Sequence, residues 1–462
     1  MSRIVIMGGG PAGYEAALVA AQHGAEVTVV ERDGMGGACV LDDCVPSKTF
    51  ISSAGIRTEL RRANELGLNA DHKAATVDLA RINARVGSLA RAQSADVRAR
   101  LEREGVRLIS GSAAFAEKPL SGAAHSVVAD GETLPADVVL IATGATPRVL
   151  PSAVPDGERI LTWRQLYNLD ELPEHLIVIG SGVTGAEFVS AYTELGVRVT
   201  LVSSRDRVLP TEDADAATVL EDVFAERGVT ILPRTRAEQV SRDGDGVVVT
   251  LGDGSTVSGS HVLMTVGSVP NTQDLGLDRV GVTTDRGGFI PVDRVSRTAA
   301  PGVYAAGDCT GLLMLASVAA MQGRIAVWHA LGEGVAPIKL KTVAAAVFTR
   351  PEIATVGISQ ASIDAGEVQA RTIMMPLGTN PRAKMQGLRR GFVKLFCRPT
   401  SGVVIGGVVV APVASELILP IAMAVQNTLT VDDLARTFSV YPSLSGSITE
   451  AGRQLMRHDD LD

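Results

Sequence analysis

Residues 3–31 read RIVIMGGGPAGYEAALVAAQHGAEVTVVE, and this stretch decides the fold of the chain. An apolar strand runs into a glycine-rich turn, which is followed by a helix and a second apolar strand. Gly8 permits a tight turn, Gly10 lets a pyrophosphate approach the backbone, and Gly13 lets the helix pack closely against the strand. Glu31 ends the second strand, where a carboxylate can accept hydrogen bonds from ribose hydroxyls. The stretch therefore predicts a βαβ unit that binds a dinucleotide, with the pyrophosphate at the helix N-terminus.

Residues 176–203 repeat this pattern of strand, turn, helix and strand. The glycines of the second turn are Gly180, Gly182 and Gly185. The distance in sequence from the first glycine to the end of the second strand is 23 positions in both units, from Gly8 to Glu31 and from Gly180 to Ser203. The second unit therefore has Ser203 where the first has the Glu31 carboxylate. Two such units in one chain predict two bound nucleotides.

Two of the four cysteines, Cys39 and Cys44, lie between a glycine pair and Pro46. On an ideal helix their Cα atoms would be roughly 8.6 Å apart, whereas a disulfide requires about 4.4–6.8 Å. If the two bond, the backbone here cannot be a regular helix, and the flanking glycines and proline permit that. The alternative is two unrelated buried thiols, because a free cysteine behaves as a small hydrophobic residue.

The segment GGACVLDDCVPSK, residues 36–48, resembles the redox-active disulfide segment of the pyridine nucleotide–disulfide oxidoreductases, such as dihydrolipoamide dehydrogenase and glutathione reductase. The resemblance extends over essentially the whole chain. The strand that ends in Ala-Thr-Gly144 is similar to the family's second FAD segment, although alone it is equally well a parallel strand before a turn. The segment that ends at Asp308 is similar to the third. The resemblance assigns FAD to the first unit and NADPH or NADH to the second.

The resemblance also implies roles for individual side chains. Lys48 would lie beside the flavin and pair with Glu187 of the second nucleotide helix, where its charge stabilises the reduced flavin. The alternatives are an exposed first-turn lysine and a solvated glutamate. Cys44 would lie nearest the flavin, and Cys39 would meet an external disulfide. We expect the two cysteines to form a disulfide in the resting enzyme.

The expected fold class is α/β, with two Rossmann-like dinucleotide-binding domains and an α+β C-terminal dimerisation domain. A chain of 462 residues is too long for one core. By the resemblance, the chain returns to the FAD domain after the nicotinamide domain, and the enzyme is a homodimer. The expected segments are 1–152 (FAD), 153–271 (NAD(P)), 272–340 (return to FAD) and 341–462 (interface).

The chain departs from the disulfide-reducing family members in two places. Asp42 and Asp43 lie between the cysteines, where neutral residues are usual, and nearby carboxylates raise thiol pKa values. Near the C-terminus, Tyr441 and Gly446 replace a histidine that moves protons to and from the substrate thiols and a glutamate that orients this histidine. The one histidine of the interface segment, His458, has nothing nearby to orient it. The rate of disulfide exchange with lipoamide or glutathione is therefore expected to be very low.

These departures leave hydride transfer from NAD(P)H to flavin unaffected, so we expect an NAD(P)H dehydrogenase with quinone-like acceptors. One alternative is a disulfide reductase like dihydrolipoamide dehydrogenase, or a pyridine nucleotide transhydrogenase. Another is a flavoprotein redox sensor that uses Cys39 and Cys44 as its switch. Ser203 lacks the carboxylate that repels a 2′-phosphate and Arg205 follows it, so NADPH should serve at least as well as NADH. Gly185 favours NADH.

Composition and charge argue against several other classes of protein. The net charge is −8 with no basic patch, so we expect no nucleic-acid partner. The longest apolar run, residues 312–331, is interrupted by Gln322, Arg324 and His329 and predicts a core helix instead of a membrane span. Four cysteines in so long a chain do not make a secreted disulfide scaffold, so we expect a cytoplasmic protein. No metal site is expected.

Overall fold

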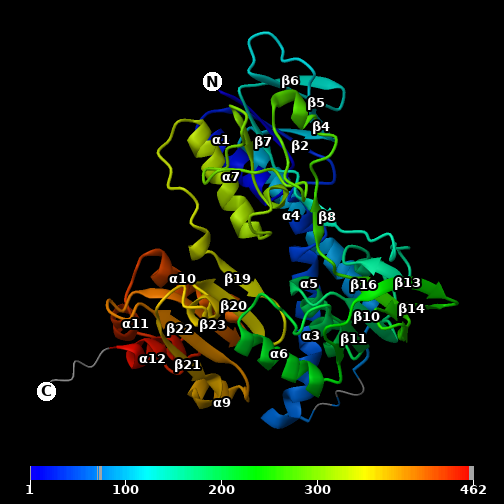
Figure 1. Cartoon of the computed structure of the whole chain (residues 1–462), viewed down its shortest axis with the longest axis vertical. Coiled ribbons are helices and arrows are strands. Elements are labelled where there is room, and N and C mark those ends of the chain that lie inside the picture. The colour runs from blue at the N-terminus through cyan, green and yellow to red at the C-terminus, as the bar shows by residue number, and fades with distance from the viewer. Residues whose placement is uncertain (1, 70, 72–74, 457–462) are drawn as a thin grey trace.

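The computed structural model describes residues 2–69, 71 and 75–456, and these form three five-stranded sheets in separate parts of the molecule (Figure 1). The first sheet is parallel, with strand order β18-β7-β1-β2-β3. Its strands are β1 (Arg3–Met7), β2 (Glu26–Glu31), β3 (Arg107–Ser110), β7 (Val138–Ile141) and β18 (Val303–Ala305). Because β18 follows the second sheet in sequence, the chain returns to the first sheet after building the second.

Helices cover the first sheet. Helix α1 (Pro11–Gln22) connects β1 to β2 and packs against α7 (Ala316–Ala330). The contact is close because Gly323 has no side chain: a Cβ there would lie 2.1 Å from the Ala12 carbonyl oxygen. Two long helices follow the cysteine segment, α3 (Cys44–Arg62) and α4 (Leu79–Arg103).

The second sheet is also parallel, with order β12-β11-β10-β16-β9. Its strands are β9 (Ile160–Thr162), β10 (His175–Ile179), β11 (Arg198–Val202), β12 (Thr230–Leu232) and β16 (His261–Met264). Every residue of β10 is buried, as expected for the central strand of a sheet covered on both faces. Helix α5 (Val183–Glu194) connects β10 to β11, and α6 (Ala214–Glu226) precedes β12.

The third sheet is antiparallel, with order β19-β20-β23-β22-β21, and α10 (Ala414–Gln426) packs on it. The strands are β19 (Ala344–Val347), β20 (Glu352–Gly357), β21 (Arg371–Pro376), β22 (Phe392–Cys397) and β23 (Val404–Ala411). Two further helices, α11 (Val431–Arg436) and α12 (Gly446–Leu455), complete this part. The predicted fold class is confirmed, whereas the residues given as domain boundaries stay predictions.

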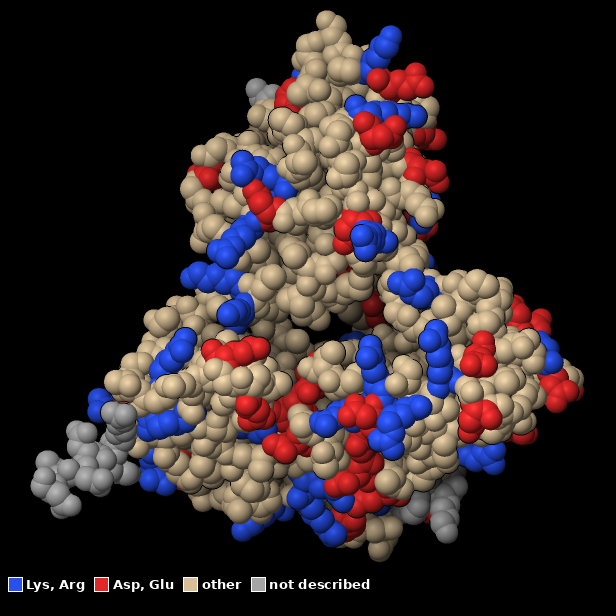
Figure 2. Space-filling model, in the orientation of Figure 1, with Lys and Arg blue, Asp and Glu red and all other residues tan. Residues whose placement is uncertain are grey.

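An ion cluster around a buried lysine joins the third sheet to α6 of the second. Lys394 of β22 has a side chain only 3% exposed, and its Nζ lies 2.7 Å from Asp213 and 2.6 Å from Asp215 at the start of α6. Asp213 also accepts hydrogen bonds from two backbone amides of α6. Elsewhere, on the face in Figure 2, acidic and basic side chains are interspersed.

The long apolar run forms a helix only from Ala316 onward. Among the helices of the described residues, none is both long and apolar enough to cross a bilayer.

Candidate active site

The glycines of the first turn have the close contacts that their sequence pattern predicts. Gly8 has φ +110°, and a Cβ there would lie 2.2 Å from the carbonyl oxygen of Ala142, the residue after β7. A Cβ at Gly13 would lie 1.9 Å from the Gly8 carbonyl oxygen. A Cβ at Gly10, by contrast, would meet no heavy atom within 4 Å. Gly10, the N-cap of α1, therefore leaves room for a group placed against the helix N-terminus.

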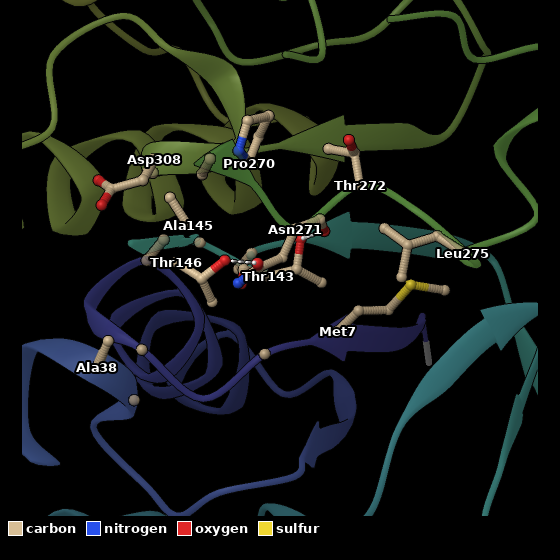
Figure 3. A pocket seen from close by; sticks show the side chains of 18 of the residues that line it. Met7, Ala38, Thr143, Ala145, Thr146, Pro270, Asn271, Thr272, Leu275 and Asp308 are labelled. Carbon is tan, nitrogen blue, oxygen red and sulfur yellow. Dashed lines mark hydrogen bonds between the residues drawn. The ribbon is translucent and has the colours of Figure 1, made fainter. Parts of the chain in front are cut away.

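A cavity of about 1410 Å³ opens at this turn. Its wall includes Gly8, Gly10, Glu31, both Cys39 and Cys44, and Asp308. Figure 3 shows Met7 on the first strand, Ala38 on the segment before α3, and Asp308 on the return segment around this space. Its size and its glycine-lined floor suit an elongated dinucleotide such as FAD.

Glu31 has both carboxylate oxygens engaged by the backbone. It accepts hydrogen bonds from the amides of Gly9 (2.7 Å) and Asp33 (2.7 Å). These bonds hold the carboxylate at the end of β2 beside the cavity, where the sequence pattern predicts the ribose contact.

The return segment places Asp308 in the cavity wall just after β18. Burial, with Asp43 as a second cause, raises the pKa of Asp308 to about 6. Gly144, with φ +69°, lies in the same wall, as its sequence segment predicts.

Lys48 and Glu187 form the pair that the resemblance implies. Lys48 Nζ lies 2.8 Å from Glu187 Oε2, and the Glu187 side chain is only 4% exposed. The other oxygen, Oε1, accepts a hydrogen bond from the Phe348 amide at 2.9 Å. The Phe348 ring lies 4.9 Å from the Lys48 nitrogen. Glu187 of α5 therefore contacts both Lys48 of α3 and the segment after β19. The alternative of a solvated glutamate is excluded.

Cys39 and Cys44 lie on two helices instead of one. Cys39 is in α2 (Gly37–Leu41), and α3 begins at Cys44, so the helical path is interrupted between them, as a pair at disulfide distance requires. In the structure both are free thiols. A hydrogen bond between the two thiols lowers the pKa of Cys39 and raises the pKa of Cys44. The disulfide of the resting enzyme stays a prediction.

The two aspartates between the cysteines have different surroundings. Asp42 lies 3.4 Å from the guanidinium of Arg164, which in turn lies over the Trp163 ring. Burial raises the pKa of Asp42, and Arg164 opposes that rise. Asp43 carries no such ion pair among the described residues, and burial raises its pKa as well. Asp43 raises the pKa of both thiols, in the direction expected from the sequence, although the bond between the thiols outweighs it at Cys39.

The second turn repeats the geometry of the first. Gly180 has φ +112°, and a Cβ there would lie 2.3 Å from the Thr265 carbonyl oxygen. A Cβ at Gly185 would lie 2.0 Å from the Gly180 carbonyl oxygen, and a Cβ at Gly182 would meet no heavy atom within 4 Å. The second unit therefore leaves the same room for a phosphate group at the N-terminus of α5.

Ser203 follows β11, as predicted, but it is 1% exposed. Its hydroxyl lies 2.7 Å from the Ser181 hydroxyl and accepts a hydrogen bond from the Arg205 amide at 3.1 Å. The hydroxyl thus shapes the loop that follows, and it would have to give up these bonds to reach a ribose. Arg205 is an exposed residue of this loop.

Tyr441 is 82% exposed, and the nearby Phe438 and Val440 are exposed as well. Gly446 begins α12, and a Cβ there would meet only two serine hydroxyls at 3.6 and 3.8 Å, so a larger residue can be accommodated. His458 lies outside the described residues.

Comparison with known families gives two matches along this chain. Residues 2–323 match the model of the pyridine nucleotide-disulphide oxidoreductases, and residues 343–452 match the dimerisation domain of the same family. The chain belongs to this family.

Individual relatives of the oxidoreductase are similar over their full length. NAD(P)H dehydrogenase (quinone) from two strains of Mycobacterium tuberculosis is 67% identical, covering 100% of this chain and 95% of the relative. Dihydrolipoyl dehydrogenase 2 of Haloarcula marismortui is 34% identical, over 97% of this chain and 96% of the relative. The crystal structure of LpdA from M. tuberculosis superposes with a TM-score of 0.95, at 66% identity over 99% of this chain and 100% of that one.

The contacts of three residues in the oxidoreductase's site, Asn271, Phe348 and Arg164, were not predicted from the sequence. Asn271 donates to the Thr143 carbonyl (2.9 Å) and accepts from the Thr146 hydroxyl (3.2 Å), which closes one side of the cavity (Figure 3). The Pro-Asn pair at 270–271 is a turn signal that could have drawn attention to it. The contacts of Phe348 with Glu187 and of Arg164 with Asp42 carry no local signal, since their partners are distant in sequence.

The other two cysteines of the oxidoreductase, Cys309 and Cys397, are fully buried, in agreement with a packing role. Burial raises the pKa of Cys309 to about 11. Within the described ranges no group of three or more His, Cys, Asp or Glu side chains could hold a metal ion.

Proposed function

We propose that this chain is an FAD-dependent NAD(P)H dehydrogenase that passes electrons to quinones. The observation that carries the proposal is the Lys48–Glu187 pair, intact in a chain with Tyr441 and Gly446 near its C-terminus. The name of the M. tuberculosis relative supports it. The pair serves hydride transfer, while the tyrosine and glycine cannot supply the base and orienting carboxylate of a disulfide reductase.

Gly8, Gly10, Gly13, Glu31, Gly144 and Asp308 would hold FAD in the cavity. Gly180, Gly182, Gly185 and Arg205 would hold NADPH or NADH, with Ser203 shaping the loop. FAD, when bound, accepts the hydride of the nicotinamide and passes two electrons on. The Lys48 ammonium would then stabilise negative charge at the reduced ring, and Glu187 compensates the cost of burying that ammonium.

The enzyme is proposed to act as a homodimer through the dimerisation domain. Exposed apolar side chains at Phe438, Val440 and Tyr441, which a partner subunit would cover, support this arrangement. Tyr441 would then lie at the position from which a disulfide reductase supplies its base. A cytoplasmic location is part of the same proposal, on the cysteine content of the chain.

An acceptor panel with purified protein tests the function. We expect ready oxidation of NADPH with quinones and negligible reduction of lipoamide or glutathione disulfide. Comparable rates with lipoamide and a quinone would refute the proposal, because a phenol is a poor base at pH 7. A preparation without flavin absorbance that FAD does not reconstitute would also refute it.

Restoring the missing base gives a sharper version of the test. Tyr441→His combined with Gly446→Glu should raise lipoamide reduction by about tenfold or more, since a positioned base contributes about 10²–10⁴-fold. Quinone turnover should stay roughly unchanged. Tyr441→Phe is the matched control, and it should leave both activities as they are.

A further inference from the structure

The segment that follows β19 is joined to α5 at three residues along one side of that helix. Glu187 accepts a hydrogen bond from the Phe348 amide at 2.9 Å, and Ser190 accepts one from the Arg350 amide at 3.1 Å. Glu194, one turn further on, lies 3.3 Å from the Arg350 guanidinium. All three side chains of α5 are buried. Because residues three and four positions apart are neighbours on a helix, these contacts hold the segment in one register against α5.

The Arg350 side chain also fixes the segment against α3. Its guanidinium donates to Glu59 of α3 at 2.9 Å. A Cβ at Gly55 of the same helix would lie 2.1 Å from Arg350 Nη2, so the absence of a side chain there lets the guanidinium lie against the helix. Thr58 of α3 donates to Glu194, the partner that Arg350 has on α5, at 2.9 Å. The segment is thus tied to both helices of the Lys48–Glu187 pair.

This anchoring places the Phe348 ring over the Lys48 ammonium, with the ring centroid 4.9 Å from Nζ. Among the described residues, Glu187 is the one hydrogen-bond acceptor of this nitrogen, at 2.8 Å. The Lys48 side chain is 28% exposed. Because a lysine carries its charge on a flexible stem, one carboxylate alone does not confine a partly exposed ammonium to one place.

Packing does not account for the Phe348 ring. Its neighbour Val347 is 3% exposed and belongs to the largest core cluster, which also contains the buried rings of Phe50 and Phe188. Phe348 is half-buried and is not part of that cluster of described residues. The ring therefore contributes less to the core than the other two rings do, and the Lys48 ammonium is the charged group that it covers.

We propose that the Phe348 ring is a positioning group for the Lys48 ammonium in flavin reduction, an inference that rests on the proposed function. The negative face of an aromatic ring attracts a cation without accepting its proton. The ring thus confines the ammonium beside Glu187, which compensates its charge. The ammonium is then already in place when reduction brings negative charge to the bound flavin, and little reorganisation is needed at that moment.

Fluorinated phenylalanines at position 348 separate this attraction from packing, because they keep the shape of the ring and weaken its negative face. The holoenzyme is treated with limiting acetic anhydride at a fixed alkaline pH. Acetylation of Lys48, relative to that of the exposed Lys384, is then measured by mass spectrometry. The unprotonated amine is the reactive form, so a weaker hold on the ammonium raises the rate. We expect the rate to rise with each added fluorine, and by about threefold to tenfold for trifluorophenylalanine.

The midpoint potential of the flavin tests the consequence for the reaction. Cys39→Ser prevents any disulfide between the two cysteines, so that the flavin alone is titrated. In this background Phe348→Leu should stabilise the reduced flavin about fivefold less, which lowers the two-electron midpoint potential by about 20 mV. Phe348→Tyr keeps an aromatic face and should restore the parent potential. The measurement requires no nucleotide and no acceptor.

Phe392 and Lys394 of the third sheet provide a matched control, since the Phe392 ring lies 5.5 Å from Lys394 Nζ. Phe392→Leu makes the same change at a ring that is 4% exposed and does not line the cavity. It should lower the melting temperature at least as much as Phe348→Leu does, and it should leave the flavin potential unchanged. Flavin absorbance of each variant reports that it has folded and kept its cofactor.

Three outcomes would overturn the proposal: a Lys48 acetylation rate that does not respond to fluorination, a flavin potential unchanged in Phe348→Leu, or an equal shift of that potential in Phe392→Leu. A holoenzyme that shows both Phe348-dependent changes yet fails to reduce quinones refutes the proposed function alone. A holoenzyme that reduces quinones and shows neither change refutes the role of Phe348 alone.

Discussion

The two nucleotide units have nearly the same backbone and different side chains at the ends of their second strands. A Cβ at Gly8 or at Gly180 would come within 2.2 or 2.3 Å of the carbonyl oxygen of the residue that follows the neighbouring strand. The strand ends differ, because the first unit continues as Glu31-Arg32-Asp33 and the second as Ser203-Ser204-Arg205. The shared geometry leaves the same room at the two helix N-termini, and we propose that the strand end determines which nucleotide is preferred.

The helices of the two units also use one position in different ways. Glu15 of α1 and Glu187 of α5 occupy equivalent places. Glu15 pairs with Arg324 of α7 at 2.6 Å, a contact within the first nucleotide unit and its covering helix. Glu187 pairs with Lys48 of α3, a helix that follows the first nucleotide unit in the sequence. The repeat therefore places an ion pair within one unit and, in the other, the pair that we propose acts in flavin reduction.

The largest effect is expected from breaking one turn at a time. Gly8→Ala forces a side chain into a φ of +110° and against the Ala142 carbonyl, so the purified protein should contain little or no FAD. Gly180→Ala should keep FAD and lose its reduction by NADPH by roughly 100-fold or more. Flavin absorbance and stopped-flow reduction measure the two results. Loss of FAD from Gly180→Ala would contradict the independence of the two units.

The paired glutamates give the next effect. Glu187→Gln leaves Lys48 without its charge partner, so flavin reduction should slow by roughly tenfold to 100-fold. Glu15→Gln is the matched control, since it removes the equivalent charge from the other unit, and it should change the reduction rate by less than about twofold. Equal losses in the two variants would show that Glu187 acts through general stability.

Arg205 tests the strand ends. Because its guanidinium is exposed on the loop after Ser203 and can reach a 2′-phosphate, Arg205→Ala should raise the KM for NADPH by about tenfold and leave the KM for NADH nearly unchanged. Steady-state kinetics with both nucleotides and one quinone measure the change. An equal rise for NADH would place Arg205 outside the 2′-phosphate contact.

The glycine motifs of the two nucleotide units could be predicted from the sequence because local spacing determines them, whereas the return of the chain to the first sheet came from the resemblance. The pairing of Lys48 with Glu187 came from the resemblance, since nothing local connects positions so far apart. The surroundings of Asp43 and the role of Asn271 depend on side chains that only the folded chain brings together. The spacing of the second unit predicted Ser203 at the end of its second strand. The hydrogen bonds of the Ser203 hydroxyl to Ser181 and to the Arg205 amide could not be predicted from that spacing.

The smallest and most specific effect concerns a second difference between the units. In the first unit Gly9 packs against Glu31. A Cβ at Gly9 would lie 3.1 Å from the Glu31 side chain, and the Gly9 amide donates a hydrogen bond to the Glu31 carboxylate. The second unit has Ser181 at the equivalent position, and its hydroxyl bonds to Ser203. The two units thus contain matched pairs, glycine with glutamate and serine with serine.

A glutamate at position 203 therefore requires a glycine at position 181. Ser203→Glu alone should crowd the Ser181 side chain and weaken binding of both nucleotides. Ser181→Gly combined with Ser203→Glu should rebuild the arrangement of the first unit, with a carboxylate free to accept ribose hydroxyls and to repel a 2′-phosphate. We expect the double variant to shift the ratio of kcat/KM toward NADH by about fivefold, close to 1 kcal/mol. Ser181→Gly alone is the control and should leave the ratio unchanged. If Ser203→Glu by itself gives the full shift with intact NADH binding, the pairing of positions 181 and 203 is wrong, and the strand end alone determines the preference.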